Sequence, residues 1–161
     1  MYCAKLPVQQ NHFVVVKFTS RHYQAKRFMV LKYQPSVRSV LMCDFRGMVV
    51  PEIVKVRPVV VVSRNRHNNQ LVTVVPISTT EPLPRRDCHH ELSENPIPGN
   101  EHITCWVKCD MLMTVSLSRL DRIKTRTWEG RNYIVPMIAE DEFENIKRAV
   151  LHGIGMAYLY R

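Results

Sequence analysis

Two stretches of the chain decide its fold: Arg57-Pro58-Val59-Val60-Val61-Val62-Ser63 and Leu71-Val72-Thr73-Val74-Val75-Pro76-Ile77. Both are rich in β-branched residues, which favour strands. The polar residues 64–69 lie between them, and such polar clusters mark turns. The sequence therefore predicts an antiparallel hairpin. Its first run is apolar on both faces, which predicts a buried central strand.

Further strand-like segments flank this hairpin. Residues 40–45 precede it, and residues 105–109 and, more weakly, 113–115 follow it. Between them, the proline-rich residues 80–104 indicate a long loop with at most one weak strand. Near the C-terminus, apolar residues recur at helical spacing behind three acids, at Phe143, Ile146, Val150 and Ile154. We therefore expect a mainly β fold, a small barrel with one C-terminal helix packed on it.

The length of 161 residues suits one compact domain, and the 45% hydrophobic and 23% charged content is ordinary for a globular chain. No apolar stretch approaches the ~20 residues of a membrane-spanning helix, so we expect no membrane association. The barrel is assigned to residues 37–161, after a basic extension over residues 1–36. Two segments of the extension, 13–18 and 28–33, have strand composition. An added hairpin, a transit-like segment and a segment without fixed structure all remain open.

The net charge of +9 is concentrated in the first part of the chain. Residues 1–69 hold 12 Lys/Arg and 2 Asp/Glu, a charge of +10, whereas residues 70–161 hold 11 and 12, a charge of −1. A one-sided basic excess indicates a polyanionic partner, most often nucleic acid, although a merely basic protein is the alternative.

The five cysteines form no regular framework and no secretory signal is evident. This pattern favours reduced thiols in a cytoplasmic protein.

Three polar residues are predicted to meet at one end of the hairpin. Arg57 opens the first strand, Ser78 closes the second, and Glu52 lies on the loop that leads in. A carboxylate can accept a proton from a ribose 2′-hydroxyl, and a guanidinium can bind phosphate oxygens. A hydroxyl can donate one further hydrogen bond to the phosphate. The set therefore fits RNA chemistry. The alternative is an exposed Arg57–Glu52 ion pair beside a serine that only ends a strand.

The same segments resemble the core of the MazF/PemK family, the toxins of type II toxin–antitoxin systems. The resemblance rests on Asp44-Phe45, Glu52, the RPVVVVS and VPIS segments, the segment from Trp106 to Val115, Ser118-Arg119-Leu120 and the terminal helix. It covers about residues 36–155 in the family's order. The RPVVVVS and VPIS segments together are fairly specific, whereas either alone is weak evidence.

The resemblance implies an SH3-like barrel that forms a homodimer, is held inactive by an antitoxin, and cleaves single-stranded RNA or mRNA without a metal or other cofactor. Attack by the 2′-hydroxyl would leave a 2′,3′-cyclic phosphate and a 5′-hydroxyl. The family's catalytic arginine matches Arg57, its catalytic Ser/Thr matches Ser78, with Thr79 beside it, and its loop glutamate matches Glu52. Because the pKa of arginine is above about 12, Arg57 is assigned first to stabilising the transition-state charge.

The chain departs from the family pattern at several points. Arg38-Ser39 replaces the glycine–acid pair that usually opens the first strand, and Ser78 stands where many relatives have threonine. The 80–104 loop is long, and residues 1–36 lie outside the pattern. These differences bear on dimer geometry and RNA preference more than on catalysis.

Basic and aromatic residues near the hairpin are candidates for binding the rest of the RNA. The candidate RNA-binding residues are Lys55, Arg64, Arg66, His67, Thr79, Arg85 and Arg86. For Arg64, Arg66 and His67 the alternative is a solvated hairpin tip. Trp106 is either a stacking platform for a base or part of the core.

A zinc site is not expected. The cysteines and histidines at 88–90, 102, 105 and 109 lack the paired C-x₂-C spacing of structural zinc sites. We expect buried free cysteines and exposed loop histidines instead.

Two rival functions for the whole protein remain open. One is a non-catalytic nucleic-acid-binding SH3-like barrel, and the other is a toxin that inhibits a topoisomerase and acts independently of Arg57 and RNA.

Overall fold

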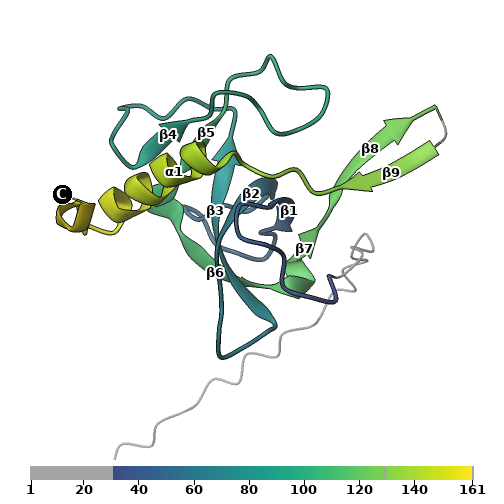
Figure 1. Ribbon diagram of the computed structural model, residues 1–161, viewed down its shortest axis with the longest axis horizontal. Coiled ribbons are helices and arrows are strands. Elements are labelled where there is room, and N and C mark those ends of the chain that lie inside the picture. Colours follow the sequence, from purple (N-terminus) through teal and green to yellow (C-terminus); the bar gives the residue numbers. More distant parts are fainter. Residues whose placement is uncertain (1–30, 129, 161) are drawn as a thin grey trace, which may run out of the picture.

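The computed structural model describes residues 31–128 and 130–160 (Figure 1). The elements, in chain order, are β1 (Val40–Asp44), β2 (Val56–Arg64), β3 (Leu71–Ser78), β4 (His89–Glu91), β5 (Trp106–Lys108), η1 (Cys109–Met111), β6 (Met113–Ser116), η2 (Leu117–Arg119), β7 (Leu120–Asp121), β8 (Ile123–Thr127), β9 (Gly130–Ile134), α1 (Glu140–Gly153) and η3 (Ala157–Tyr160). The strand candidate at 13–18 lies outside the described residues. The candidate at 28–33 is described only from residue 31, where the chain forms no strand.

One antiparallel sheet carries most of the fold. Its strand order is β4-β5-β3-β2-β1-β7, and β6 pairs with the first half of β3. The predicted hairpin is confirmed, because β2 pairs with β3 in the register Val59↔Pro76 and Val60↔Val75. The mainly β architecture with one C-terminal helix is also confirmed. The expected barrel is not closed, because β4 and β7 end the two sides of the sheet without pairing with each other in the described chain.

The central strand β2 is buried on both faces, as its composition predicts. Val60 belongs to a cluster that includes Phe143 and Ile146 of α1, whereas Val59 and Val61 belong to a second cluster under β1, β6 and β7. Alternate residues of a strand point to opposite faces, so one β-branched run supplies both clusters. This burial fixes β2, and with it the position of Arg57 at its start.

The terminal helix is confirmed at Glu140–Gly153. Three acids occupy its first turn, where they interact favourably with the helix dipole. Its buried residues recur on one face that packs on the sheet. At its last residue, Gly153, a side chain would lie 2.7 Å from the backbone oxygen of Cys109. The absence of a side chain therefore lets α1 approach η1 closely.

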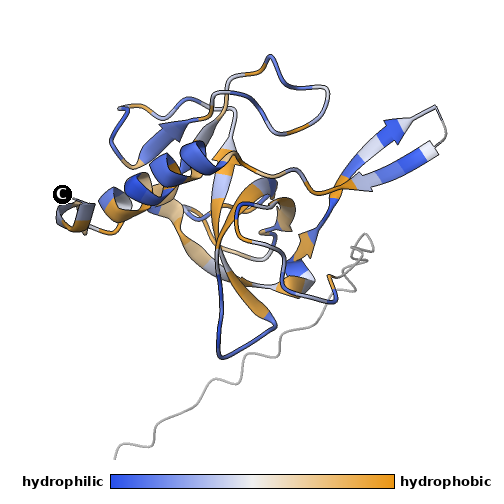
Figure 2. Ribbon diagram, in the orientation of Figure 1, coloured by the Kyte–Doolittle hydropathy of each residue, from blue (hydrophilic) through white to orange (hydrophobic). Residues whose placement is uncertain are grey.

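A second hairpin, β8–β9, was not predicted from the sequence. It forms a separate two-stranded sheet that projects from the main body (Figure 1). Most of its surface is hydrophilic, in contrast to the centre of the main sheet (Figure 2). Trp128, which follows β8, is 94% exposed. Among the described helices, none has the length and hydropathy needed to cross a membrane.

Arg38 occupies an unusual backbone conformation just before β1. Its φ of +74° lies in the left-handed region, which glycine adopts most readily. Its backbone N–H donates to the Val61 carbonyl at 2.9 Å, and its carbonyl accepts from Ile138 N–H at 3.0 Å. This chain therefore places an arginine in a conformation that glycine adopts more readily.

Candidate functional site

A pocket of about 280 Å³ lies at the end of the β2–β3 hairpin where β2 begins and β3 ends. Val59 pairs with Pro76 in this antiparallel hairpin. Arg57 lies two residues before Val59 and Ser78 two residues after Pro76, so the register places them across from each other. The residues that line it are Glu52, Ile53, Val54, Lys55, Arg57, Pro76, Ile77, Ser78, Thr80, Lys108 and Met111. The three residues predicted to carry chemistry therefore share one pocket.

Arg57 is half-buried near the start of β2. It pairs with Cys43 of the neighbouring strand β1. Within the described residues, its guanidinium makes no hydrogen bond and no ion pair. The ion pair with Glu52 that the sequence left as an alternative is not formed. A guanidinium held by its strand but without a protein acceptor can offer its forked donors to a phosphate group.

Ser78 is half-buried at the end of β3. Its Oγ accepts a hydrogen bond from the backbone N–H of Thr80 at 3.1 Å. The bond orients the hydroxyl oxygen and leaves its proton available to donate. Both threonines that follow are exposed, and of the two only Thr80 lines the pocket, whereas Thr79 does not.

Glu52 is exposed on the loop between β1 and β2, and this loop is closed by two reciprocal bonds. The Val49 N–H donates to Oε2 of Glu52 at 2.8 Å, and the Glu52 N–H donates to the Val49 carbonyl at 2.8 Å. One carboxylate oxygen is thereby fixed by the loop itself. The other oxygen makes no bond within the described residues and can accept a proton or a hydroxyl.

Two lysines add positive charge to the pocket. Lys55, one of the RNA-binding candidates, lies on the loop just before β2, and Lys108 ends β5. Sequence reasoning did not assign Lys108, because its approach depends on pairing between Ser78 and Trp106 across a long intervening loop. With Arg57, the pocket holds three cationic side chains and one carboxylate. Such a balance favours a polyanionic ligand.

The candidates at the hairpin tip do not join this pocket. Arg64, Arg66 and His67 lie at the opposite end of β2, so the length of the strand separates them from Arg57. Arg64 Nε donates to the Pro35 carbonyl at 2.8 Å, which ties the tip to the segment that precedes β1. Arg64 and Arg66 line a second hollow, of about 520 Å³, with Gln34 and Asn65.

The candidates on the long loop differ from each other. Arg85 pairs with Glu81 at 2.7 Å and with Glu91 at 3.1 Å, so its charge is already matched. The side chain of Arg86 is exposed. Trp106 is only 6% exposed and lies under the Arg85 guanidinium. It therefore belongs to the core, and its role as an open stacking platform is wrong.

The cysteines and loop histidines are only partly as expected. Cys43, Cys88, Cys105 and Cys109 are free and buried, and burial raises the pKa of the Cys43 thiol to about 12 and that of Cys105 to about 11. The predicted exposure of the histidines holds for His102 but not for His89 and His90, which are half-buried in β4. The reason is that β4 pairs with β5 and lies beside α1, where His90 Nε2 is 3.5 Å from Oε1 of Glu142.

Comparison with known proteins defines the class. Residues 36–152 match the family described as PemK-like, MazF-like toxins of type II toxin–antitoxin systems. The match spans well over half of the sequence, and the chain belongs to this family. The sequence is also 29% identical over 147 residues to the protein YifN of Escherichia coli (strain K12), covering 78% of this chain and 95% of that one. A Haemophilus influenzae protein is 27% identical over 144 residues, covering 81% of this chain and 96% of its own.

Solved structures show the same fold at lower sequence identity. MazF from Deinococcus radiodurans superposes with a TM-score of 0.56 at 15% identity, covering 77% of this chain and 99% of MazF. A mycobacterial endoribonuclease in complex with its cognate antitoxin superposes with a TM-score of 0.54 at 19% identity, covering 76% of this chain and 97% of the endoribonuclease. These likenesses establish the fold that positions the pocket.

Proposed function

We propose that the protein is a toxin that cleaves single-stranded RNA, including mRNA, at the Arg57–Ser78 pocket, without a metal ion in the reaction. The observation that carries this proposal is the shared pocket itself, in which an unpaired guanidinium, an oriented hydroxyl and a loop carboxylate lie beside two lysines. Binding of phosphate alone would need no carboxylate. Membership of a toxin family and the resemblance of these three residues to its catalytic set support the same activity.

The reaction proposed is an internal transesterification. The ribose 2′-oxygen attacks the adjacent phosphorus, its proton passes to the Glu52 carboxylate, and the bond from phosphorus to the 5′-oxygen breaks. The 5′-oxygen takes up a proton from water, and the hydroxide that remains takes the proton back from Glu52. The products are a 2′,3′-cyclic phosphate and a 5′-hydroxyl. Arg57 and Ser78 donate hydrogen bonds to the phosphate oxygens, whose negative charge grows in the transition state.

The RNA on either side of the cut requires further contacts. Lys55 and Lys108 lie in the pocket and would bind the nearest phosphates. We propose Thr79, Arg64, Arg66, His67, Arg85 and Arg86 as contacts of the flanking strand. All six residues are exposed, but Arg85 would first have to exchange its two carboxylate partners for phosphate.

We further propose that the toxin acts in the cytoplasm as a homodimer and is held inactive by a cognate antitoxin. The mycobacterial relative of the same fold forms a complex with its cognate antitoxin. The barrel is assigned to residues 37–161, with residues 1–36 as an extension outside the family pattern.

The reaction is tested with the purified protein, a long single-stranded RNA and excess chelator, with the new ends then mapped. The proposal predicts recurrent cuts with 5′-hydroxyl ends. An oligonucleotide with one 2′-deoxy sugar immediately 5′ of a mapped cut should resist cleavage there, because the attacking oxygen is missing. Tight RNA binding without cuts would instead indicate a non-catalytic barrel. Neither binding nor cuts would direct the search to a protein target such as a topoisomerase.

A further inference from the structure

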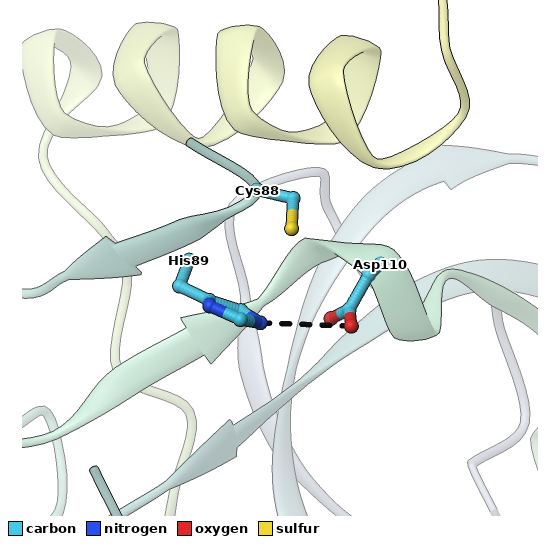
Figure 3. A group of neighbouring side chains, drawn as sticks. All are labelled: Cys88, His89 and Asp110. Carbon is cyan, nitrogen blue, oxygen red and sulfur yellow. Dashed lines mark ion pairs between the residues drawn. The ribbon is translucent and has the colours of Figure 1, made fainter. Parts of the chain in front are cut away.

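A second cluster of reactive side chains lies between β4, η1 and α1, outside the RNA pocket. Cys88 directly precedes β4, His89 begins β4, and Asp110 is in η1. One ligand atom from each of the three lies within 4.8 Å of the other two. The His89 Nε2 and Asp110 Oδ2 atoms are 3.5 Å apart. Figure 3 shows the thiol, the imidazole and the carboxylate pointing toward one common space.

We propose that Cys88, His89 and Asp110 bind a zinc ion. Thiolate, imidazole and carboxylate are the three ligand types that zinc takes in proteins, and zinc sites with three protein ligands complete their tetrahedron with water. Zinc–nitrogen and zinc–oxygen bonds of roughly 2.1 Å at a tetrahedral angle place the two ligand atoms about 3.4 Å apart. The observed 3.5 Å between His89 and Asp110 already has this spacing. The thiol sulfur of Cys88 lies within 4.8 Å of both atoms.

The backbone holds the two ligand-bearing segments together before any ion binds. The Cys109 N–H donates to the Cys88 carbonyl at 2.9 Å, and His89 pairs with Lys108 across the β4–β5 ladder. On the other side, α1 approaches the backbone of Cys109 and Asp110 at Gly153. A site whose ligands stand on fixed elements loses little conformational entropy when the ion binds.

Burial and charge at the cluster suit a cation that enters from one side. Cys88 is 9% exposed and the His89 side chain 10%, whereas the Asp110 side chain is 45% exposed and leaves an entry path. The Arg86 N–H donates to Nδ1 of His89 at a long 3.3 Å. Zinc at Nε2 leaves the proton on Nδ1, so this weak bond would be given up when the ion binds.

The ion would join the 80–104 loop to η1. Lys108 and Met111, on either side of the Cys109-Asp110 pair, line the RNA pocket. None of Arg57, Ser78 and Glu52 is a ligand, so the zinc would brace one wall of the pocket and take no part in the proposed cleavage. The spacing of cysteines and histidines alone does not predict a zinc site, and the fold adds the carboxylate of Asp110.

Cobalt substitution tests the site without any measurement of RNA cleavage. The full-length, reduced, metal-free protein is titrated with Co²⁺ and followed by absorbance. The proposal predicts one equivalent of Co²⁺, with the intense visible bands of tetrahedral cobalt and a thiolate-to-cobalt charge-transfer band. Zinc should displace these bands, and added zinc should raise the melting temperature. The matched control, Cys105→Ser, removes a buried cysteine outside the cluster and should keep both bands.

Variants of the ligands separate this site from other cysteines and histidines. Cys88→Ser should lose the charge-transfer band, and Asp110→Asn, at the exposed ligand, should weaken Co²⁺ binding at least tenfold. Circular dichroism checks that each variant folds, and Asp110→Asn keeps the test valid if Cys88→Ser does not. The proposal is overturned if the wild-type protein shows no charge-transfer band, or if the band persists unchanged in Cys88→Ser or binding is unchanged in Asp110→Asn. Either result leaves the proposed RNA cleavage untouched.

Discussion

Arg57 and Ser78 stand across from each other at the same end of the β2–β3 hairpin and line one pocket. Their strands are central to the sheet, and the Val59↔Pro76 pair beside them is part of its buried ladder. The two residues therefore stand on strands that are anchored by buried neighbours. A site on such strands keeps its geometry better than one built on loops.

Ser78 offers a test of the hydroxyl alone. Ser78→Ala should slow RNA cleavage by about 100-fold, because a donor to the developing phosphate charge is lost. Ser78→Thr keeps the hydroxyl and should stay within a few-fold of the wild-type rate. Single-turnover cleavage of a fluorescent RNA measures both. If the alanine and threonine variants cleave RNA at equal rates, the hydroxyl of Ser78 has no role in the reaction.

Gly153 offers a test of the contact between α1 and η1. An added Cβ would lie 2.7 Å from the Cys109 oxygen and 2.9 Å from the Asp110 nitrogen, both backbone atoms that cannot swing aside. Gly153→Ala should therefore lower the free energy of unfolding by about 1–3 kcal/mol, although alanine is the better helix former. Urea denaturation measures the change. Asn145→Ala, an exposed change in the same helix, should stay within about 0.5 kcal/mol of wild type.

Asp44 should make the stability depend on acid pH. The Arg46 side chain donates hydrogen bonds to its carboxylate, and this pairing holds the pKa of Asp44 below its ordinary 3.8. A lowered pKa in the folded state contributes stability above the unfolded pKa, and that contribution is lost as the pH falls through the folded pKa.

Asp44→Asn should accordingly cost about 1 kcal/mol at neutral pH. The difference from wild type should shrink as the pH falls below about 4 and vanish once the wild-type carboxylate is protonated. Urea denaturation of both proteins across this pH range measures it. A constant difference between the two proteins at every pH would show that the Asp44–Arg46 pair has no electrostatic role.

The hairpin and the terminal helix could be predicted because their signals are local. The β-branched runs on either side of residues 64–69 specify a strand pair, and pairing alone brings Arg57 and Ser78 together. The β8–β9 hairpin was not predicted because Ile123 is the only buried residue among those described in its two strands, so its apolar signal is weak. Lys108 and Asp110 could not be assigned, since their positions depend on the β3–β5 and β4–β5 pairings across the long loop.

The most direct test of the central claim compares Arg57→Ala with the wild-type protein on one long single-stranded RNA in chelator. Arg126→Ala, an exposed arginine on β8, serves as the matched control. We predict that Arg57→Ala folds normally by circular dichroism and cleaves at least about 100-fold more slowly, because its guanidinium stabilises the transition-state charge. Arg126→Ala should retain the wild-type rate. A folded Arg57→Ala protein that cuts the same positions at the wild-type rate would contradict the proposed site.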